Sequence, residues 1–456
     1  MEIIFVHLIR AADKEFDLRN FVTETARGNL TSALFLMQDK LFRSIEGCPL
    51  AYRAPHQMLS LSAKENVLST NGIVARQGIG AATRFHRLVW EVPSSLIGSD
   101  WVHMAHGTSP SKYYKPTTHV FLWADEGKEA KADVVQRYPY LKGNYGFKIQ
   151  AEEYYLRPGL CYGKRTEDFT VQILPSNHVF SFEGTAIFTD GSLLDDWSLL
   201  ALLNSTPVNH WLSIICAEHK AYNYVEAIPI PEDIGQFQAA LREKAQKAWG
   251  LQHSLDTCNL TSPVFVRPAI LNDIENTLSS LVDAFTKRVQ AVNVELTRIQ
   301  GEVDDVVIRA YGLTEPLLGF KEDEFADVEP VDEEKDVDFG FGVSILVCQY
   351  LDYLVGVLFG RWDVRIALNP KLAPKLPDPF DPLPVCPPGM LVGPDGLPAE
   401  PDRIVSEEWL RARPDAIAPP SEGSVRNPTI PDSEYPLRIS WDGVLVDDPG
   451  FNGDRP

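Results

Sequence analysis

The chain alternates between stretches with helical periodicity and a long stretch of short β-prone runs. Residues 1–48 place apolar side chains at roughly helical spacing, from Ile3 and Ile4 to Leu41 and Ile45, which predicts a helical N-terminal segment. From Pro49 to Phe188 the pattern changes to short runs between turn residues, which predicts an α+β domain with long loops. The expected strands are Ile73–Arg76, Arg84–Val92, Thr118–Trp123, Phe147–Ala151, Phe169–Leu174, Val179–Phe182 and Ala186–Phe188.

A junction follows this domain at Asp195–Pro231. Asp195 or Asp196 is a suitable cap for a helix with an apolar face, and the run Asn204–Pro207 ends that helix and starts another, with Ser205 or Thr206 as its cap and a proline in its first turn. Tyr222–Ile230 then alternates in the manner of a strand and ends on prolines. We therefore expect residues 49–232 to form one domain that these elements close.

Residues 233–368 have the pattern of a helical spacer. Pro268–Leu313 repeats apolar residues every three or four positions, from Leu271 to Val306, which predicts a helix of about forty residues with a coiled-coil-like seam. The run 321–338 holds ten carboxylates and is typical of an exposed loop, and Val343–Arg361 predicts a buried helix rather than a membrane span, since it carries Gln349 and Asp352. Residues 369–456 hold 19 of the 34 prolines, so we expect an extended region there.

Charge is distributed unevenly along the chain. Residues 1–232 carry 22 lysines and arginines against 25 aspartates and glutamates, a net of −3, whereas residues 233–456 carry 20 against 38, a net of −18, which together give the −21 of the whole chain. The acidic second half therefore does not exclude a locally basic groove in the first half. The six scattered cysteines contain no Cys-x-x-Cys pair, and no secretory leader pattern opens the chain, so we expect reduced thiols and a cytoplasmic protein.

The sequence contains few candidate catalytic motifs, and each of them is weak. Phe339–Gly342 lacks the strand-to-helix context of a cofactor turn. Asp125–Lys128 has the acid-x-Lys shape of a nuclease half-motif, but such triplets are common in exposed loops. Adenine methylation needs an Asn/Asp-Pro-Pro-Tyr/Phe loop to hold a flipped base, and the pairs Pro387-Pro388 and Pro419-Pro420 do not provide one. The histidines, including His103 and His106, do not have metal-ligand spacing and are expected on the surface or in loops. We expect neither a catalytic residue nor a metal ligand in this chain.

Residues suited to DNA recognition are present instead. Arginine and glutamine on glycine-flanked loops suit bidentate base contacts, and lysine, tyrosine and threonine suit phosphates. A set of solvated loops explains the same composition equally well. The candidates for a DNA groove are Arg76, Gln77, Arg84, Arg87, Lys112, Tyr114, Arg157, Lys164, Arg165 and Thr166.

A dozen ordered matches resemble the target-recognition half of PglX-like (BREX-type) adenine-specific DNA methyltransferases and related fused restriction–modification enzymes. The resemblance covers about residues 49–450. Three positions depart from the usual family pattern: Gly163 stands where serine is frequent, and Glu183 and Thr185 replace lysine and proline. The matching stretches include Val74–Gly78, Leu88–Val92, Tyr155–Leu160, Lys164–Thr166, Phe180–Phe188, Glu295–Gln300, Gly360–Arg365, Leu383–Leu391 and Trp441–Gly450.

The resemblance implies a function and a set of partners. Family members carry an upstream methyltransferase domain, so residues 1–48 would be the remnant of a linker to it, and S-adenosylmethionine would bind that catalytic partner rather than this chain. The first half would contact double-stranded DNA, and the seam Leu271–Val306 would dock the catalytic domain. The system would be a restriction–modification or phage-defence system in which this chain alone is not catalytic.

Two other interpretations stay open. One is an interaction protein whose acidic half binds a basic partner or mimics DNA. The other is an inactive fragment, which predicts an unstable chain because the long apolar seam would lack its neighbour.

Overall fold

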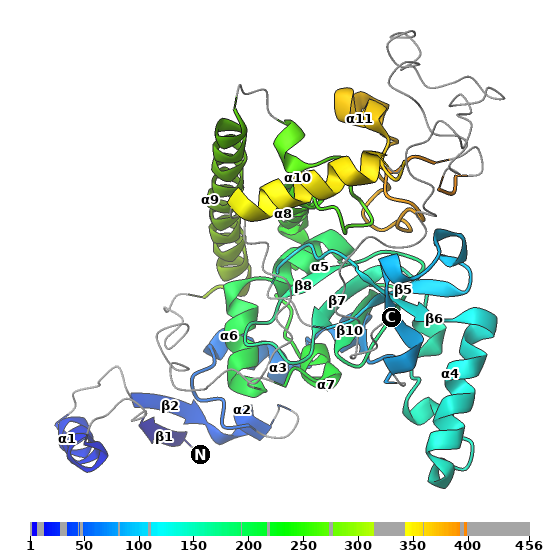
Figure 1. Cartoon of the computed structure of the whole chain (residues 1–456). Coiled ribbons are helices and arrows are strands. Elements are labelled where there is room, and N and C mark those ends of the chain that lie inside the picture. The colour runs from blue at the N-terminus through cyan, green and yellow to red at the C-terminus, as the bar shows by residue number, and fades with distance from the viewer. Residues whose placement is uncertain are drawn as a thin grey trace, which may run out of the picture.

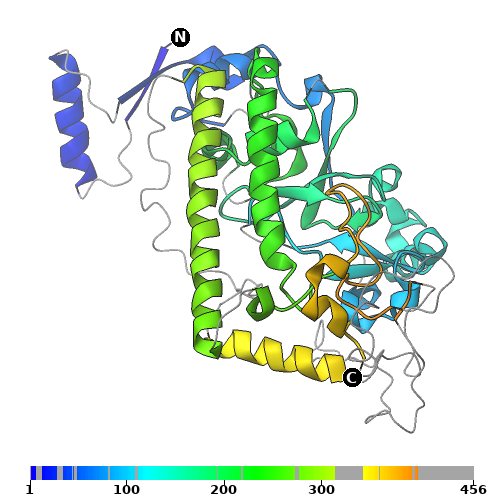
Figure 2. The same ribbon diagram turned by 90° about the horizontal axis from the view of Figure 1, so that it is seen from above.

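The computed structural model has an α+β fold, as the sequence predicts (Figure 1). Two four-stranded sheets lie at the centre, a long helix α9 lies on one side of them, and helix α4 lies on the opposite side, as both views show (Figures 1 and 2). The structure describes residues 2–6, 13–27, 34–43, 45, 49–80, 83–107, 111–192, 194–216, 219–272, 277–313, 343–358, 360–392 and 396–398.

The N-terminal segment is not a run of helix, so the prediction for residues 1–48 was wrong in part. Strands β1 (Glu2–Val6) and β2 (Leu34–Gln38) pair antiparallel, and only α1 (Lys14–Ala26) and the short α2 (Asp39–Arg43) are helical. Each strand contains four consecutive apolar residues, and a run of that kind fits a strand as well as part of a helix, so periodicity alone cannot separate the two. The linker origin of this segment stays a prediction.

The first sheet is antiparallel, with strand order β3-β10-β7-β8. Its strands are β3 (Ile73–Arg76), β10 (Gly184–Thr189), β7 (Gly159–Gly163) and β8 (Val171–Leu174). The sequence predicted β3 with the bounds that the structure shows, and it missed β7, whose glycines at both ends look like turn residues.

The second sheet has the order β4-β6-β5-β9, with β9 parallel to β5. The run Phe147–Ala151 was predicted as a strand, but only Ile149 forms an isolated bridge there. Helix α4 (Ala124–Arg137) was missed, because its acidic start resembles an exposed loop. The strands are β4 (His86–Leu88), β6 (His119–Leu122), β5 (Trp101–Ala105) and β9 (His178–Phe180).

The junction contains the two helices that the sequence predicts. Asp195 caps α5 (Asp196–Leu203) by accepting from the backbone N–H groups of Trp197 and Ser198, both at 3.1 Å. Ser205 is the N-cap residue of α6 (Thr206–Ile215), with Pro207 in the first turn. The predicted strand at Tyr222–Ile230 is instead the short helix α7 (Tyr222–Glu226), because tertiary packing of Val225 into the core overrides the local alternation.

Two asparagines of the junction hold the outer edge of β8. Val171 donates its N–H to Asn204 Oδ1 (2.9 Å), and Asn204 Nδ2 donates back to the Val171 carbonyl (2.8 Å). Asn209 exchanges the same two bonds with Phe169, at 2.7 and 3.0 Å. These side-chain amides therefore form hydrogen bonds with the edge of the sheet as a neighbouring strand would. Helices α5, α6 and α3 (His56–Ala63) share one apolar core with this sheet.

The predicted seam is the buried face of α9 (Leu278–Tyr311), which the chain itself covers. Ile299, Val303 and Val307 are buried in the core shared with α5, α6 and α8 (Gln238–Asp256), and Phe285 packs with Leu346 farther along. The prediction that Leu271–Val306 docks a catalytic partner was therefore wrong. The same packing removes the reason for expecting an unstable fragment.

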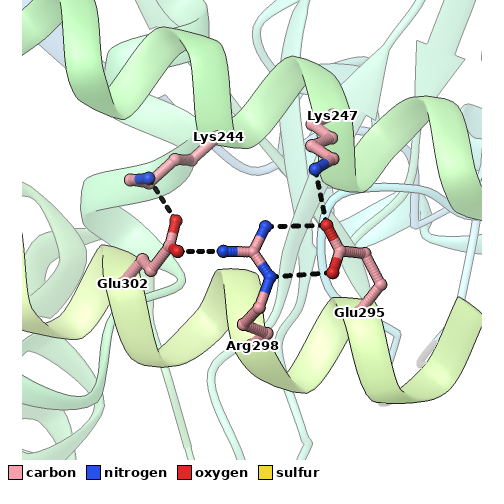
Figure 3. A network of polar contacts seen from close by, with 5 residues as sticks. All are labelled: Lys244, Lys247, Glu295, Arg298 and Glu302. Atoms are coloured by element: carbon pink, nitrogen blue, oxygen red, sulfur yellow. Dashed lines mark hydrogen bonds and ion pairs between the residues drawn. The ribbon is translucent and has the colours of Figure 1, made fainter.

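Charged side chains join α8 to α9 outside this apolar contact (Figure 3). Arg298 donates to both carboxylate oxygens of Glu295, at 2.7 and 2.8 Å, and Glu302 accepts from both Arg298 and Lys244. The hydrogen bonds from Arg298 and Lys247 lower the pKa of Glu295 to about 2. The stretch Glu295–Gln300 that carries part of the family resemblance is thus a contact between two helices.

The last described elements are α10 (Val343–Leu358) and α11 (Val364–Leu368). Leu346 and Tyr353 of α10 are buried, but Ile345, Leu351 and Leu358 are exposed, so the expectation of a buried helix was wrong in part. Among the described helices none has the length and apolar character needed to cross a membrane. The acidic run 321–338 and residues 399–456 lie outside the described part of the chain.

Candidate nucleic-acid interface

Five of the ten predicted DNA contacts lie together along the first sheet. Arg76 ends β3, and Lys164 and Arg165 follow β7, while β10 pairs with both strands through Ala186 and Gly184. Lys164 Nζ donates to Gln77 Oε1 at 3.3 Å, 87 residues apart in sequence. We call Arg157, Arg76, Gln77, Lys164 and Arg165 the recognition row.

Tyr154 connects the two arginines at one end of the row. The guanidinium carbon of Arg157 lies 5.0 Å from the centre of the Tyr154 ring, and that of Arg76 lies 5.2 Å from the same centre. Cation–π contacts of this kind are worth about 0.5–1 kcal/mol at exposed sites. The ring therefore sets the spacing of the two cations.

Each arginine of the row has a carboxylate partner, which the sequence did not predict. All three pairs are partly exposed, and ion pairs in that setting contribute about 0–1 kcal/mol, so a phosphate or a base edge can compete for the guanidinium groups. The pairs are Arg76–Glu226 (2.8 Å), Arg157–Asp190 (2.5 Å) and Arg165–Glu183 (3.6 Å).

Arg165 is the most exposed member of these pairs, with 63% of its side chain accessible. Its Nε donates to Nε2 of His219 at 3.0 Å, which fixes the direction of the guanidinium group. His219 lies 54 residues from Arg165 along the chain, and no local sequence pattern links the two, so sequence analysis missed this contact.

The buried Lys220 shapes the loop that carries Lys164 and Arg165. Its backbone N–H donates to the Lys164 carbonyl at 3.0 Å, and its Nζ donates to the carbonyls of Thr166 and of Glu167, the latter at 3.1 Å. Thr166 is itself buried and donates Oγ1 to the Gly163 carbonyl at 3.3 Å. Thr166 therefore stabilises the loop from inside, and the structure does not support its predicted phosphate contact.

Glycines next to the row are required by packing rather than by a ligand. A side chain at Gly184 would place Cβ 2.5 Å from the Ala105 carbonyl oxygen, and one at Gly80 would meet the Phe182 ring at 2.8 Å. The prediction placed base-reading side chains on glycine-flanked loops, and in the structure the glycines allow two sheets to approach each other.

Arg84 and Arg87 lie apart from the row, Arg84 in the turn Thr83–Phe85 and Arg87 in β4 of the second sheet. Arg84 pairs with Asp133 of α4 at 3.0 Å, and its side chain is 60% exposed. Arg87 donates to the carbonyls of Arg84 (3.1 Å) and His86 (2.7 Å), so its guanidinium group stabilises the backbone of the residues just before it.

Lys112 and Tyr114 connect the segment before β6 to helices α5 and α8. Lys112 Nζ donates to the Asn204 carbonyl at 2.8 Å, which is a helix C-terminus. Tyr114 donates its hydroxyl to Oδ2 of the buried Asp256 at 2.6 Å, and burial raises the pKa of the tyrosine well above its usual value. Both side chains are used inside the protein, and the structure does not place them with the row.

The histidines are more buried than the sequence predicts. His86, His103, His178 and His210 are buried, and the rings of His103 and His178 stack at 5.1 Å. His86, His103 and His178 lie in strands β4, β5 and β9, and His210 lies in α6. Within the described part of the chain, no group of three or more His, Cys, Asp or Glu side chains is arranged to hold a metal ion.

Comparison with known proteins identifies no family for this chain. No protein-family model and no curated protein matches it. A solved structure described as the type IIL restriction-modification enzyme MmeI in complex with DNA is similar over 54% of this chain, with 13% identity and a TM-score of 0.34. The match spans 33% of that enzyme's chain.

Proposed function

We propose that this chain recognises a specific double-stranded DNA sequence for an adenine-specific DNA methyltransferase of a restriction–modification or phage-defence system in the cytoplasm. The methyltransferase domain and its S-adenosylmethionine would lie outside these 456 residues. The recognition row is the observation that carries the proposal, because it gathers residues that sequence analysis selected from three separate segments.

The chemistry of the row suits the edges and phosphates of a duplex. Arginine donates two hydrogen bonds to guanine in the major groove, and glutamine makes the equivalent pair with adenine. Arg165 and Gln77 are the members with these roles, and Lys164, which bridges toward Gln77, suits a phosphate. On binding, DNA would replace Glu183 as the partner of the Arg165 guanidinium.

The experiment selects bound duplexes from a randomised DNA library with the purified chain at about 150 mM salt, where non-specific phosphate binding is weak. We expect enrichment of a short motif. The proposal fails if no motif is enriched, either by the chain alone or with the methyltransferase domain added. Strong, salt-sensitive binding to basic proteins in that case would favour the acidic interaction protein instead.

Arg165→Ala tests the row directly. Loss of a base contact should weaken binding to the selected duplex about 5- to 150-fold, corresponding to about 1–3 kcal/mol, with relaxed preference at one base position. Lys287→Ala is the matched control, since it removes one positive charge from an exposed position of α9. Equal affinity of the Arg165 and Lys287 variants, measured by titration of labelled duplex, would exclude Arg165 from the interface.

A further inference from the structure

A second surface, beside the recognition row, combines exposed aromatic rings with lysine. It is formed by the segment after α4 and by one residue that precedes β10. Lys148 Nζ lies 5.6 Å from the Tyr138 ring centre, 5.4 Å from that of Phe147 and 5.7 Å from that of Phe182. The Tyr140 ring lies 6.0 Å from Tyr138. We call Tyr138, Tyr140, Phe147, Lys148 and Phe182 the aromatic platform.

The platform leaves large apolar area in water. Tyr140 is 69% exposed and Phe147 is 49% exposed, although both lie in a folded, hydrogen-bonded segment rather than at a chain end. The Tyr138 and Tyr140 rings are inclined by 77° to one another, so the platform does not present one flat apolar face of the kind that pairs with a helix. Grouped exposed aromatics of this kind mark a binding surface more often than a packing defect.

The backbone fixes the platform next to the recognition row. Gly80 donates its N–H to the Lys148 carbonyl at 2.6 Å, and Gln150 donates to the Gly78 carbonyl at 3.3 Å. Gly80 also packs against the Phe182 ring, where a side chain would collide. Lys148 and Phe182 of the platform therefore both contact Gly80, which lies three residues after Gln77 of the recognition row.

Charge near the platform is positive. Lys148 has its ammonium group over the rings, and Lys142 is exposed on the same segment. Three carboxylates on the surrounding elements have cationic partners: Asp133 pairs with Arg84 and Arg137, Glu152 pairs with Lys131 at 2.6 Å, and Glu183, next to Phe182, pairs with Arg165 at 3.6 Å. Aromatic faces combined with lysines are the features by which proteins bind unpaired bases, the rings stacking on bases and the cations meeting phosphates.

We infer that the aromatic platform binds unpaired bases of single-stranded DNA. Base pairs in a duplex cover their own faces by stacking and offer only edges, which exposed phenyl and phenol rings do not read. Chemistry on a base requires that it leave the stack, so a strand with exposed bases arises wherever such chemistry occurs. The choice of DNA as the strand rests on the proposed function, and separate variants test the platform and the recognition row.

The experiment measures fluorescence anisotropy of labelled oligothymidylate of about 12 nucleotides, within the usual site size of about 4–16 nucleotides. An abasic strand of the same length supplies phosphates and sugars without bases, and a blunt duplex supplies paired bases. We expect oligothymidylate to bind at least about tenfold more tightly than the abasic strand, because stacking on a single base is worth fivefold or more.

The variant Tyr140→Ala/Phe147→Ala removes two exposed rings and retains every charge. We expect it to lose at least about tenfold in affinity for oligothymidylate and nothing for the abasic strand. Phe16→Ala is the matched control, because Phe16 of α1 is 65% exposed and belongs to no such group. Tyr140→Ser alone should give a smaller loss in the same direction and serves if the double variant melts at a lower temperature.

Equal affinity for the abasic strand and oligothymidylate would overturn the inference, as would a double variant that binds oligothymidylate as the original chain does. Loss of duplex binding alone in the double variant would also overturn it and would assign the platform to the duplex interface. Arg165→Ala should leave oligothymidylate binding unchanged, so failure of the platform and failure of the recognition row give different results.

Discussion

Asn204 shows how much a single side chain of the junction contributes to the fold. Its amide exchanges two hydrogen bonds with Val171, and its backbone carbonyl accepts from Lys112 at 2.8 Å and from Gln300 at 3.1 Å. The residue is fully buried, so none of these groups has water as an alternative partner. A helix end, a sheet edge and the long helix α9 therefore meet at one asparagine.

Asn204→Leu should destabilise the protein by about 2–3 kcal/mol, because it retains the size of the side chain but leaves the buried Val171 N–H without a partner. Urea denaturation measures this change. Asn293→Ala, at an exposed position of α9, is the control and should stay within about 0.5 kcal/mol. Equal denaturation midpoints for the two variants would contradict the role assigned to Asn204.

Sequence analysis identified the local roles of junction residues but not their long-range ones. The cap at Asp195 follows from side-chain chemistry within three residues and is confirmed. Ser205 takes the predicted N-cap position of α6, but its hydroxyl donates to the Leu202 carbonyl and makes no capping bond. Asn204 was interpreted only as part of a helix stop, since its pairing with a strand 33 residues away leaves no local trace. Tyr114 was assigned to DNA for the same reason, its partner Asp256 being 142 residues away.

At the scale of elements, periodicity predicted the apolar face of α9 but not what covers it. A seam that steps by three or four residues is the same whether the partner is another chain or a helix of the same chain. The charge network around Arg298 marks α8 as the neighbour, and α8 runs antiparallel to α9, since Lys244 meets Glu302 and Lys247 meets Glu295 (Figure 3). The sequence pattern alone did not show whether another chain or α8 of the same chain covers this face.

The seam predicts a contrast between two positions of α9. Ile299→Ala should cost about 2–5 kcal/mol of stability, since Ile299 is 1% exposed and its removal leaves a cavity between α8 and α9. Val294→Ala, on the same helix but 72% exposed, should change stability by less than about 0.5 kcal/mol. Chemical denaturation of both variants tests this contrast. Similar small losses at both positions would mean that this face of α9 is not packed as the structure shows.

At the scale of the whole molecule, the fold class was predictable and the interface only in part. Short β-prone runs and long helical periodicity are read over windows of ten to forty residues, so α+β followed from the sequence. The recognition row depends on the order β3-β10-β7, which brings together residues about ninety positions apart. The carboxylates that pair with its arginines, such as Glu226 and Asp190, come from the same long-range folding and have no signature beside Arg76 or Arg157.

The histidines buried in and beside the second sheet predict how stability depends on pH. Burial lowers the pKa of His86, His103 and His119 to about 3. The charge of His106 adds to the shift at His86 and at His119, and that of His178 adds to the shift at His103. Burial likewise lowers the pKa of His178 to about 4, although its bond to the Ser176 carbonyl opposes the shift. As the pH falls below 6.5 the unfolded chain takes up protons that the folded chain refuses, so each histidine disfavours folding by about 1.4 kcal/mol per pH unit.

Urea midpoints measured from pH 7.5 to pH 5.5 should therefore fall steadily. The buried Asp256 acts in the opposite direction, because burial raises its pKa and the folded state then holds a proton more readily, but it is one group against four histidines. His103→Leu should flatten the fall and raise stability at pH 5.5 relative to the original chain, since neither ring nitrogen of His103 has a hydrogen-bond partner among the described residues. A midpoint that stays constant between pH 7.5 and pH 5.5 would show that these rings take up protons as readily in the folded chain as in the unfolded chain, which would require water to reach them inside the fold.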